Sequence, residues 1–381
     1  QRCVPMPRIQ EQSGIGADSR AKIQHTMHGV DEAVLVSIAH RLRTEEFEAK
    51  LAAVLRQNGR GIDVARGREQ EVARVIVPAV KCRQVVAGDR LNRSPGPGHR
   101  REVSVTASTR ALVLLGDPVG HSMSPTIQNA AFSAADVDGV YLAVRCASDD
   151  LHGFMRGLSR AGGGGNITLP HKEKAASVVD VASPAVRRTG ACNTFWGDED
   201  GRVHGDNTDV DGFRRALGSF VEGSPAGIRV LLLGAGGAAR AALMGLLEEG
   251  ADEVLIFNRT AERARAVARR IGGQKARVAP VLEGLRSESF DLVVNATRLG
   301  LGESDPSPLD FEILNRVGAA MDLVYAKKTT PFVRAAEALG IRATDGGEML
   351  VQQAAASFER WWSTPAPVEV MRAAMKGSQA G

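Results

Sequence analysis

A lysine and an aspartate in the middle of the chain have residue types suited to proton transfer. Lys172 ends the segment NITLPHK, and Asp209 ends the segment GDNTD. A lysine can donate or accept a proton beside a carbon that exchanges a hydride, and a nearby carboxylate can orient that lysine and stabilise its cationic form. We therefore interpret Lys172 and Asp209 as a candidate catalytic pair.

Hydroxyl and amide side chains gather in the same part of the chain, at the ends of expected strands. In an open α/β sheet, residues at strand ends line the ligand crevice, and these groups suit a ligand with several hydroxyls and a carboxylate. Taken singly, Ser124 and Thr208 or Asp209 are also typical helix N-caps. The polar residues considered are Ser122, Ser124, Asn166, Thr168, Asn193, Asn207 and Thr208.

A glycine-rich turn offers a second kind of site. In IRVLLLGAGGAARAALMGLLEEG (228–250), Gly234, Gly236 and Ala239 fill the small positions of the dinucleotide-binding fingerprint. Glycines allow a tight turn and a close approach to a pyrophosphate, and the following helix start presents free N–H groups. The expected strand VLIF follows, as the unit requires. The segment predicts a nicotinamide cofactor, against the alternative of a similar turn that binds nothing.

The residues that follow VLIF favour NADP over NAD. An NAD-selective site places Asp or Glu there to accept hydrogen bonds from the ribose hydroxyls, and Asn258, Arg259 and Thr260 include neither. The planar guanidinium of Arg259 suits a 2′-phosphate instead, with Arg263 one turn further on. For Arg263 alone, a solvated helix start is an alternative explanation.

Two runs of short apolar segments alternate with helical patterns and position these residues. Strands separated by helices indicate a parallel sheet with helices on both faces. The first run contains 111–116, 140–144, 162–169 and 191–196, and the second contains 228–234, 254–257, 291–296 and 319–325. The sequence therefore predicts the α/β class, with two open α/β domains in tandem.

The N-terminal part of the chain differs from the rest in charge. Residues 1–110 hold 19 of the 48 Lys and Arg and 12 of the 44 Asp and Glu, a net +7, which leaves 29 and 32, or −3, for the remainder. Helices are expected at 31–58 and 69–80, and SPGPGHRR (94–101) is typical of a linker. A nucleic-acid partner is not expected, because Phe47 is the only aromatic residue among these charges.

Composition excludes several classes of protein. With 43% hydrophobic and 24% charged residues, the chain is neither wholly disordered, collagen-like nor a disulfide scaffold. No charge-free apolar run reaches the roughly 18 residues of a membrane span, and the first residues lack the apolar segment of a secretory signal. The histidines show no metal-ligand spacing, so no metal is expected. A cytoplasmic location is favoured by the four scattered cysteines, Cys3, Cys82, Cys146 and Cys192.

Taken in order, the motifs resemble those of the shikimate dehydrogenases over about 111–375. The resemblance implies the reversible, NADPH-dependent reduction of 3-dehydroshikimate to shikimate, in chorismate and aromatic amino-acid biosynthesis. The motifs that carry it are GDPVGHSMSP (116–125), NITLPHK (166–172), GACNTF (190–195), GDNTD (205–209), GAGGAA (234–239), NRTAER (258–263), NATRLG (295–300), DLVY (322–325) and GGEMLVQQA (346–354).

The resemblance also implies a role for individual residues. Lys172 and Asp209 would be the catalytic pair. The residues expected to bind the substrate are Ser122, Ser124, Thr168, Asn193, Tyr325 and Gln353. Those expected to bind NADP are Gly234, Ala235, Gly236, Gly237, Ala238, Asn258, Arg259, Thr260, Arg263, Leu323 and Gly346.

The expected domain division follows the same resemblance. A substrate-binding domain would comprise 108–214 plus 340–375, because the C-terminal segment carries Gln353, and an NADP-binding Rossmann domain would comprise 215–339. Residues 1–107 would be a basic, partly helical extension without a counterpart in the family's basic form. The expected partners are shikimate or 3-dehydroshikimate, with no nucleic acid and no membrane, and a homodimer is an open alternative to a monomer.

Two departures from the family pattern and three alternatives stand beside this interpretation. Gln128 occupies a position where His is common, and Arg298 one where a small residue or Pro is usual. The first alternative is a quinate/shikimate dehydrogenase with dual cofactor use, against which the segment 258–260 argues. The second is a non-catalytic, NADP-sensing protein of the same fold. The third is an added protein-binding activity of the expected helix at 31–58.

Overall fold

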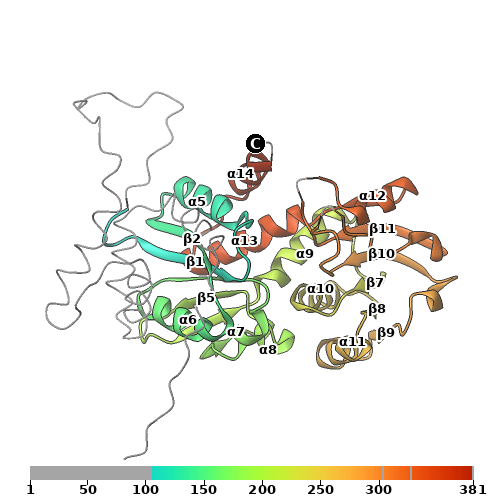
Figure 1. Cartoon of the computed structure of the whole chain (residues 1–381), viewed down its shortest axis with the longest axis horizontal. Coiled ribbons are helices and arrows are strands. Elements are labelled where there is room, and N and C mark those ends of the chain that lie inside the picture. The colour runs from blue at the N-terminus through green and yellow to red at the C-terminus, as the bar shows by residue number, and fades with distance from the viewer. Residues whose placement is uncertain (1–104, 303, 327, 380–381) are drawn as a thin grey trace, which may run out of the picture.

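The computed structural model describes residues 105–302, 304–326 and 328–379, which form two α/β lobes side by side (Figure 1). Each lobe is built on a six-stranded sheet. The predicted class of two open α/β units is therefore confirmed. The helices expected at 31–58 and 69–80 and the linker at 94–101 lie outside the described residues.

The first sheet has the strand order β2-β1-β3-β5-β6-β4. β1 pairs in parallel with β2 and β3, whereas β5 runs antiparallel to β3 and β6. Its strands are β1 (Arg110–Gly116), β2 (Gly139–Arg145), β3 (Gly164–Ile167), β4 (Val181–Ala182), β5 (Thr194–Gly197) and β6 (Val203–Asp206).

This mixed pairing corrects the expectation of a purely parallel sheet. The segment between β5 and β6 is a short turn in which Gly201 has a φ of +74°. Such a turn returns the chain directly beside the strand it has left, whereas a parallel neighbour needs a long crossover. The hairpin therefore imposes antiparallel pairing of β5 with β6, whereas β4 at the edge pairs with β6 in parallel.

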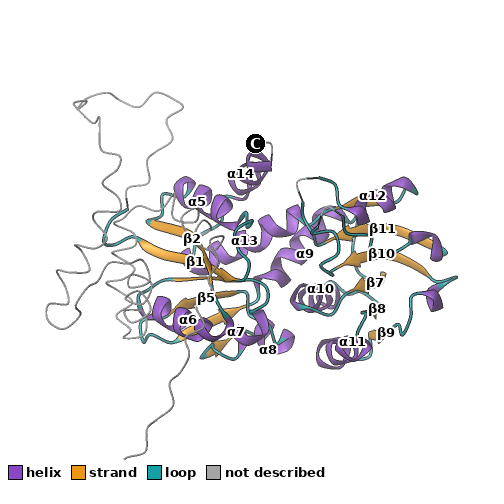
Figure 2. Ribbon diagram, viewed as in Figure 1, coloured by secondary structure: helices purple, strands orange, loops and turns teal. Residues whose placement is uncertain are grey.

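Helices cover both faces of the first sheet (Figure 2). Along β1, Val113 and Leu115 pack with the core on one face, and Leu112 and Leu114 pack with the core on the other. Both faces are thus apolar, as in a sheet buried between two helical layers. The helices of this part are α5 (Ser124–Ala134), α6 (Leu151–Arg160), α7 (Lys172–Ala176) and α8 (Pro184–Thr189), with a 3₁₀ turn, η1, at Ser148–Asp150.

The second sheet has the order β12-β11-β10-β7-β8-β9, and all its pairs are parallel. The chain order reverses at β7, which lies between β8 and β10, and such a switch point marks the ligand crevice of an open sheet. The strands are β7 (Arg229–Leu233), β8 (Glu253–Phe257), β9 (Ala276–Val278), β10 (Ser289–Asn295), β11 (Arg316–Asp322) and β12 (Arg342–Thr344). The helices are α10 (Gly237–Glu248), α11 (Ala261–Val267), which continues into a π-helical turn, η2, at Ala268–Gly272, and α12 (Pro331–Ala338).

Two long helices connect the lobes (Figure 1). α9 (Thr208–Phe220) leads from the first sheet to the second, and α13 (Gly347–Trp362) leads back. Val351 and Phe358 of α13 belong to the apolar core of the first sheet, and α14 (Val368–Gln379) packs on α5. The boundary expected at 214–215 falls within α9. None of the described helices is long and apolar enough to cross a membrane.

Candidate functional site

Lys172 and Asp209 form an ion pair where the strands of the first sheet end. Lys172 is the first residue of α7, and its Nζ lies 2.5 Å from Oδ2 of Asp209 in the first turn of α9. The two side chains are only 16% and 6% exposed, so little water competes for the pair. The structure thus brings together the two residues to which the sequence assigns proton transfer.

Asn193 holds the same carboxylate by its second oxygen. Its Nδ2 donates to Oδ1 of Asp209 at 2.8 Å, and its own Oδ1 accepts from the backbone N–H of Thr208 at 2.7 Å. Asn193 is fully buried directly before β5. Both ends of this amide therefore fix the first turn of α9 against the sheet.

Ser122 and Ser124 lie at the start of α5, with their Oγ atoms 3.2 Å apart. Between them, the backbone of Met123 lies next to the hydroxyl of Tyr325, which comes from the loop after β11 in the other lobe. Burial raises the pKa of the Tyr325 hydroxyl. Three residues expected to bind the substrate therefore lie together, although they come from both lobes.

Thr168 and Gln353 are positioned by close approaches to glycines. A Cβ on Gly116, at the end of β1, would lie 2.3 Å from Cγ2 of Thr168, and a Cβ on Gly212 of α9 would lie 2.6 Å from Cβ of Gln353 on α13. Nε2 of Gln353 donates to the carbonyl of Leu350 at 2.8 Å. A contact of Gln353 with the substrate remains a prediction.

The turn between β7 and α10 has room for a phosphate group. Gly234 has a φ of +114°, and a Cβ there would lie 2.7 Å from the carbonyl oxygen of Ala296. Gly236 is the N-cap of α10, without a side-chain cap, and nothing lies within 4 Å of a Cβ built on it. The space beside Gly236 is therefore open, and the first N–H groups of α10 have no partner within the helix, as the pyrophosphate of a dinucleotide requires. The other residues of this turn expected to bind the cofactor are Ala235, Gly237 and Ala238.

The glycine-rich turn adjoins the ion pair. A Cβ on Gly237, the first residue of α10, would lie 3.2 Å from Cδ of Lys172. The start of α10 thus packs against the stem of the lysine. The expected cofactor turn and the expected proton-transfer pair therefore meet in one site, although they belong to different lobes.

The residues after β8 present two exposed guanidinium groups. Arg259 and Arg263 are exposed, and within the described part of the chain no carboxylate lies at ion-pair distance from either. Asn258 and Thr260 form a local link, in which Nδ2 of Asn258 donates to the backbone carbonyl of Thr260 at 2.8 Å. This arrangement fits a phosphate on the ribose better than it fits ribose hydroxyls.

The ends of β10 and β11 are hydrogen-bonded to each other close to Leu323 and Gly346, two residues expected to bind the cofactor. A Cβ on Gly346 would lie 2.4 Å from the carbonyl oxygen of Leu323, so only a glycine fits there. Asp322 accepts hydrogen bonds from Nδ2 of Asn295 at 2.8 Å and from Oγ1 of Thr330 at 2.6 Å. Burial raises the pKa of Asp322 to about 6. Neither Asp322 nor Asn295 is among the residues predicted to form the site, although both end neighbouring strands.

Two expected helix caps are wrong. The N-cap of α5 is Met123 and that of α9 is Asn207, and neither makes a side-chain cap hydrogen bond. Ser124 is instead the first residue of its helix, and the oxygens of Asp209 bind other side chains. Capping therefore does not explain the residue types at these two positions.

Ser357 on α13 is a further buried polar residue, and it is not among the residues predicted from the sequence. Its Oγ lies 2.9 Å from Nδ2 of Asn166, from Oγ1 of Thr194 and from Oγ1 of Thr208. It thereby ties α13 to the elements that hold the ion pair. A signal was available, because Ser357 follows Gln353 by one helical turn in an otherwise apolar run.

The two departures from the family pattern lie at different depths. Gln128 is fully buried on α5, and its Nε2 donates to the carbonyl of Ala354 on α13 at 2.9 Å. It therefore joins two helices of the first lobe. Arg298 is exposed in the loop after β10.

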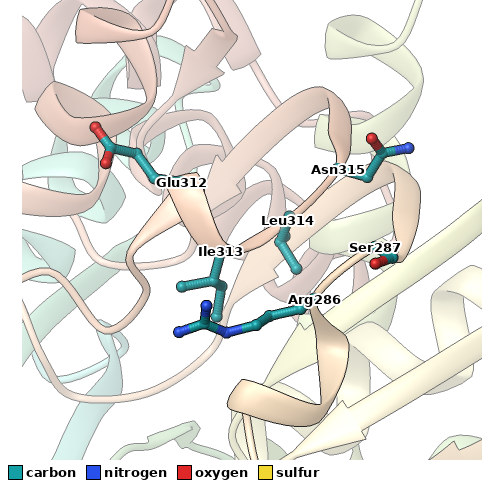
Figure 3. A pocket seen from close by; sticks show the side chains of 6 residues that line it. All are labelled: Arg286, Ser287, Glu312, Ile313, Leu314 and Asn315. Carbon is teal, nitrogen blue, oxygen red and sulfur yellow. The ribbon is translucent and has the colours of Figure 1, made fainter.

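A pocket of about 410 Å³ lies elsewhere, in the second lobe (Figure 3). Its lining residues precede β10 and β11, so it opens at the amino ends of these strands. Ligands of open α/β sheets bind at the carboxyl ends, and this pocket is therefore not part of the candidate site. It is lined by Arg286, Ser287, Glu312, Ile313, Leu314 and Asn315.

In the described part of the chain, no group of three His, Cys, Asp or Glu side chains could hold a metal ion. His171, next to Lys172, is buried, and its Nε2 lies 2.7 Å from the carbonyl oxygen of Cys146. Cys146 and Cys192 are both buried, and Cys3 and Cys82 lie outside the described residues. Burial raises the pKa of Cys192 to about 12, so this thiol is not a nucleophile near neutral pH.

Three family descriptions match successive parts of the chain. Residues 114–195 match the shikimate dehydrogenase substrate binding domain, 219–299 match shikimate / quinate 5-dehydrogenase, and 346–376 match the shikimate 5'-dehydrogenase C-terminal domain. The three matches follow the order of the motifs.

Relatives and solved structures agree with these matches. The shikimate dehydrogenase (NADP(+)) of Moorella thermoacetica is 41% identical over 295 residues, which are 73% of this chain and 98% of that protein. The structure of shikimate 5-dehydrogenase from Thermus thermophilus in complex with NADP(H) and shikimate has a TM-score of 0.64 at 39% identity, over 71% of this chain and all of that one. A 5-ketofructose reductase of Gluconobacter is also similar, with a TM-score of 0.63 at 28% identity, over 71% and 99% of the two chains.

Proposed function

Because this chain belongs to the shikimate dehydrogenase family, we propose that it catalyses the reversible, NADPH-dependent reduction of 3-dehydroshikimate to shikimate, a step of chorismate biosynthesis. The observation that carries the proposal is that the glycine-rich cofactor turn and the Lys172–Asp209 ion pair lie next to each other. The start of α10, where the space beside Gly236 is open, packs on Lys172, which is paired with Asp209.

Lys172 is the proton donor in the direction of reduction. Bound NADPH would supply the hydride to the carbonyl carbon of the substrate, and the electron pair of the C=O bond moves to its oxygen. Lys172 as an ammonium stabilises that negative charge and gives its proton to the oxygen, which forms the hydroxyl of shikimate. In the direction of oxidation the neutral amine takes the proton back.

Asp209 and Asn193 keep the lysine in position. Asp209 neutralises the ammonium through Oδ2, and Nδ2 of Asn193 engages Oδ1, so the carboxylate cannot rotate away from Lys172. A charge-assisted pair with little exposed surface keeps its geometry better than a solvated one. This support is what proton transfer to one particular oxygen needs.

The remaining polar residues would bind the substrate. Ser122 and Ser124 offer hydroxyls at the start of α5 to the substrate carboxylate, and Tyr325 offers its phenol from the other lobe. The other residues proposed to contact the substrate are Thr168, Asn193 and Gln353.

The residues of the second lobe fit NADP. The turn 234–238 would hold the pyrophosphate, and Arg259 and Arg263, which have no carboxylate partner among the described residues, would pair with the 2′-phosphate. Leu323 and Gly346 would line the nicotinamide end. We also propose the domain division of 108–214 plus 340–375 and 215–339, because α13 joins the core of the first sheet. A cytoplasmic location and a homodimer belong to the same proposal.

A four-way assay tests the proposal. The purified protein is mixed with shikimate or quinate and with NADP or NAD, and the absorbance of the reduced cofactor is followed. We expect the highest kcat/KM with shikimate and NADP. A preference for quinate with NAD would replace the proposal by a quinate/shikimate dehydrogenase, and cofactor binding without turnover would replace it by an NADP-sensing protein.

A further inference from the structure

The C-terminal end of α8 is capped by side chains from the other lobe. The last carbonyl groups of a helix have no partner within it and attract cations. Arg240 of α10 donates from Nη1 to the carbonyl of Thr189 at 2.9 Å. Arg270 of η2 donates from Nε to the carbonyl of Arg188 at 3.0 Å and from Nη2 to that of Arg187 at 2.8 Å.

Hydrogen bonds cross this contact in both directions, and the backbone on each side of it has an unusual conformation. Nη2 of Arg188 donates back to the carbonyl of Ile271 at 3.1 Å. That carbonyl belongs to the π-helical turn that ends α11, and such turns are rare and cluster at functional sites. Gly190, with a φ of +67°, ends α8, and a Cβ there would lie 2.9 Å from the guanidinium of Arg270. A glycine is thus needed for the backbone conformation and for the approach of the arginine.

Arg240 also reaches the residue next to Lys172. Its Nη2 lies 3.1 Å from Oε2 of Glu173, and its side chain is only 15% exposed. A cation in the first turn of α10 is unfavourable for the helix dipole, so the stability of α10 does not explain this arginine. The bonds to Glu173 and Thr189 do explain it, because both partners lie in the other lobe.

We propose that Arg240 and Arg270 form a latch that holds the two lobes together at the end of α8 and thereby keeps the start of α10 against Lys172. Arg240 is in this view a positioning residue, since it acts through Glu173 and α8. The kinetic part of the proposal rests on the proposed function, whereas the closure of the lobes does not.

Hydrogen exchange in the full chain tests the latch at a distant point. The backbone of Met123 lies next to the hydroxyl of Tyr325 across the lobes, at a contact to which neither arginine belongs. In Arg240→Gln and Arg270→Gln, separation of the lobes should speed exchange at Met123 by about tenfold, the usual effect of losing a hydrogen bond to a charged group. With NADP and shikimate, both KM values should rise by a similar factor.

Matched variants complete the experiment. Arg265→Gln removes an arginine that pairs with Glu262 in its own helix, and it should leave exchange at Met123 unchanged. Glu173→Gln changes a half-exposed side chain, so it should fold normally and show part of the effect of Arg240→Gln.

Three results would overturn the latch. The first is faster exchange confined to α8, which would make the contact a local cap. The second is a rise in the KM for NADP alone with unchanged exchange at Met123, which would make Arg240 a cofactor ligand. The third is unchanged exchange at Met123 in Arg240→Gln, Arg270→Gln and Glu173→Gln, as in the control Arg265→Gln. An inactive wild-type chain would remove the proposed function and leave the exchange measurement valid.

Discussion

At the residue scale, Asp209 is the point on which the candidate site depends. It receives the ammonium of Lys172 on one oxygen and the amide of Asn193 on the other, at 2.5 and 2.8 Å. The carboxylate therefore has both a charge partner and a geometric support. Replacing either member of the ion pair should damage the same step, since the two groups act as one unit.

Lys172→Met keeps the apolar stem of the side chain and removes the charge. We expect it to lower kcat by about 10²–10⁴-fold, the usual contribution of general acid–base catalysis. Asp209→Asn should lower kcat as well, and the double variant should be little worse than the worse single variant. Steady-state kinetics with NADP and shikimate measure all three. If Lys172→Met instead raised KM and left kcat nearly intact, Lys172 would be a binding residue only.

Asp322 leads to a prediction on pH. Burial raises its pKa to about 6 from 3.8, with a contribution from the nearby Asp345 carboxylate. A carboxyl group whose pKa is raised in the folded state stabilises the fold while it is protonated. This contribution is complete below the pKa of the unfolded state, and it is lost as the pH rises through about 6.

Asp322→Asn carries no such proton. As the pH rises from 4 to 8, the unfolding free energy of Asp322→Asn should therefore increase relative to that of wild type by roughly 2 kcal/mol. Urea denaturation across that range measures the difference, and Asp252→Asn, at a side chain 75% exposed, is the control. A difference that stayed constant with pH would mean that Asp322 has an ordinary pKa.

At the scale of elements, the crossing of α9 and α13 positions residues from distant parts of the chain. Gly212 of α9 faces the backbone of Gln353 so closely that a Cβ would lie 2.7 Å from its nitrogen. Gly212→Ala should therefore destabilise the protein by about 1–3 kcal/mol through overpacking, although alanine is the better helix former. It should also raise the KM for shikimate, because it displaces Gln353.

Gly218→Ala in the same helix is the matched control. Nothing lies within 4 Å of a Cβ at Gly218. Thermal or urea unfolding should therefore show unchanged stability or a gain of about 0.5–1 kcal/mol. Equal effects of the two substitutions would show that helix propensity, and not the crossing, decides the outcome.

The elements differ in how far the sequence determines them. The apolar segments at 111–116 and 228–234 become β1 and β7 almost residue for residue, because buried parallel strands are continuous apolar runs. The short β6 was not expected, since VHGD has no clear apolar pattern and its pairing is imposed by the hairpin with β5. Ser357 was missed for a related reason, because its partners come from three other elements and no local pattern records them.

At the scale of the whole molecule, the first residue of β1 and the residues just before it anchor the start of the described part of the chain. Nε of Arg110 donates to the carbonyl of Gly162 at 2.7 Å, and its guanidinium lies 5.1 Å from the ring centre of Trp362. Oγ of Ser108 donates to Asp138 at 2.9 Å. The first lobe therefore begins structurally a few residues before β1.

Removal of residues 1–104 should consequently leave activity intact, whereas a cut that also removes Arg110 should not. All motifs lie beyond this point, and Moorella thermoacetica shikimate dehydrogenase is matched over 98% of its length by 73% of this chain. We expect kcat and KM of the 105–381 protein to stay within a few-fold of the full chain. Arg110→Ala should lower the unfolding temperature in either background, because it leaves the carbonyl of Gly162 without this donor and exposes Trp362. Loss of all activity in a folded 105–381 protein would show that the N-terminal part completes the site.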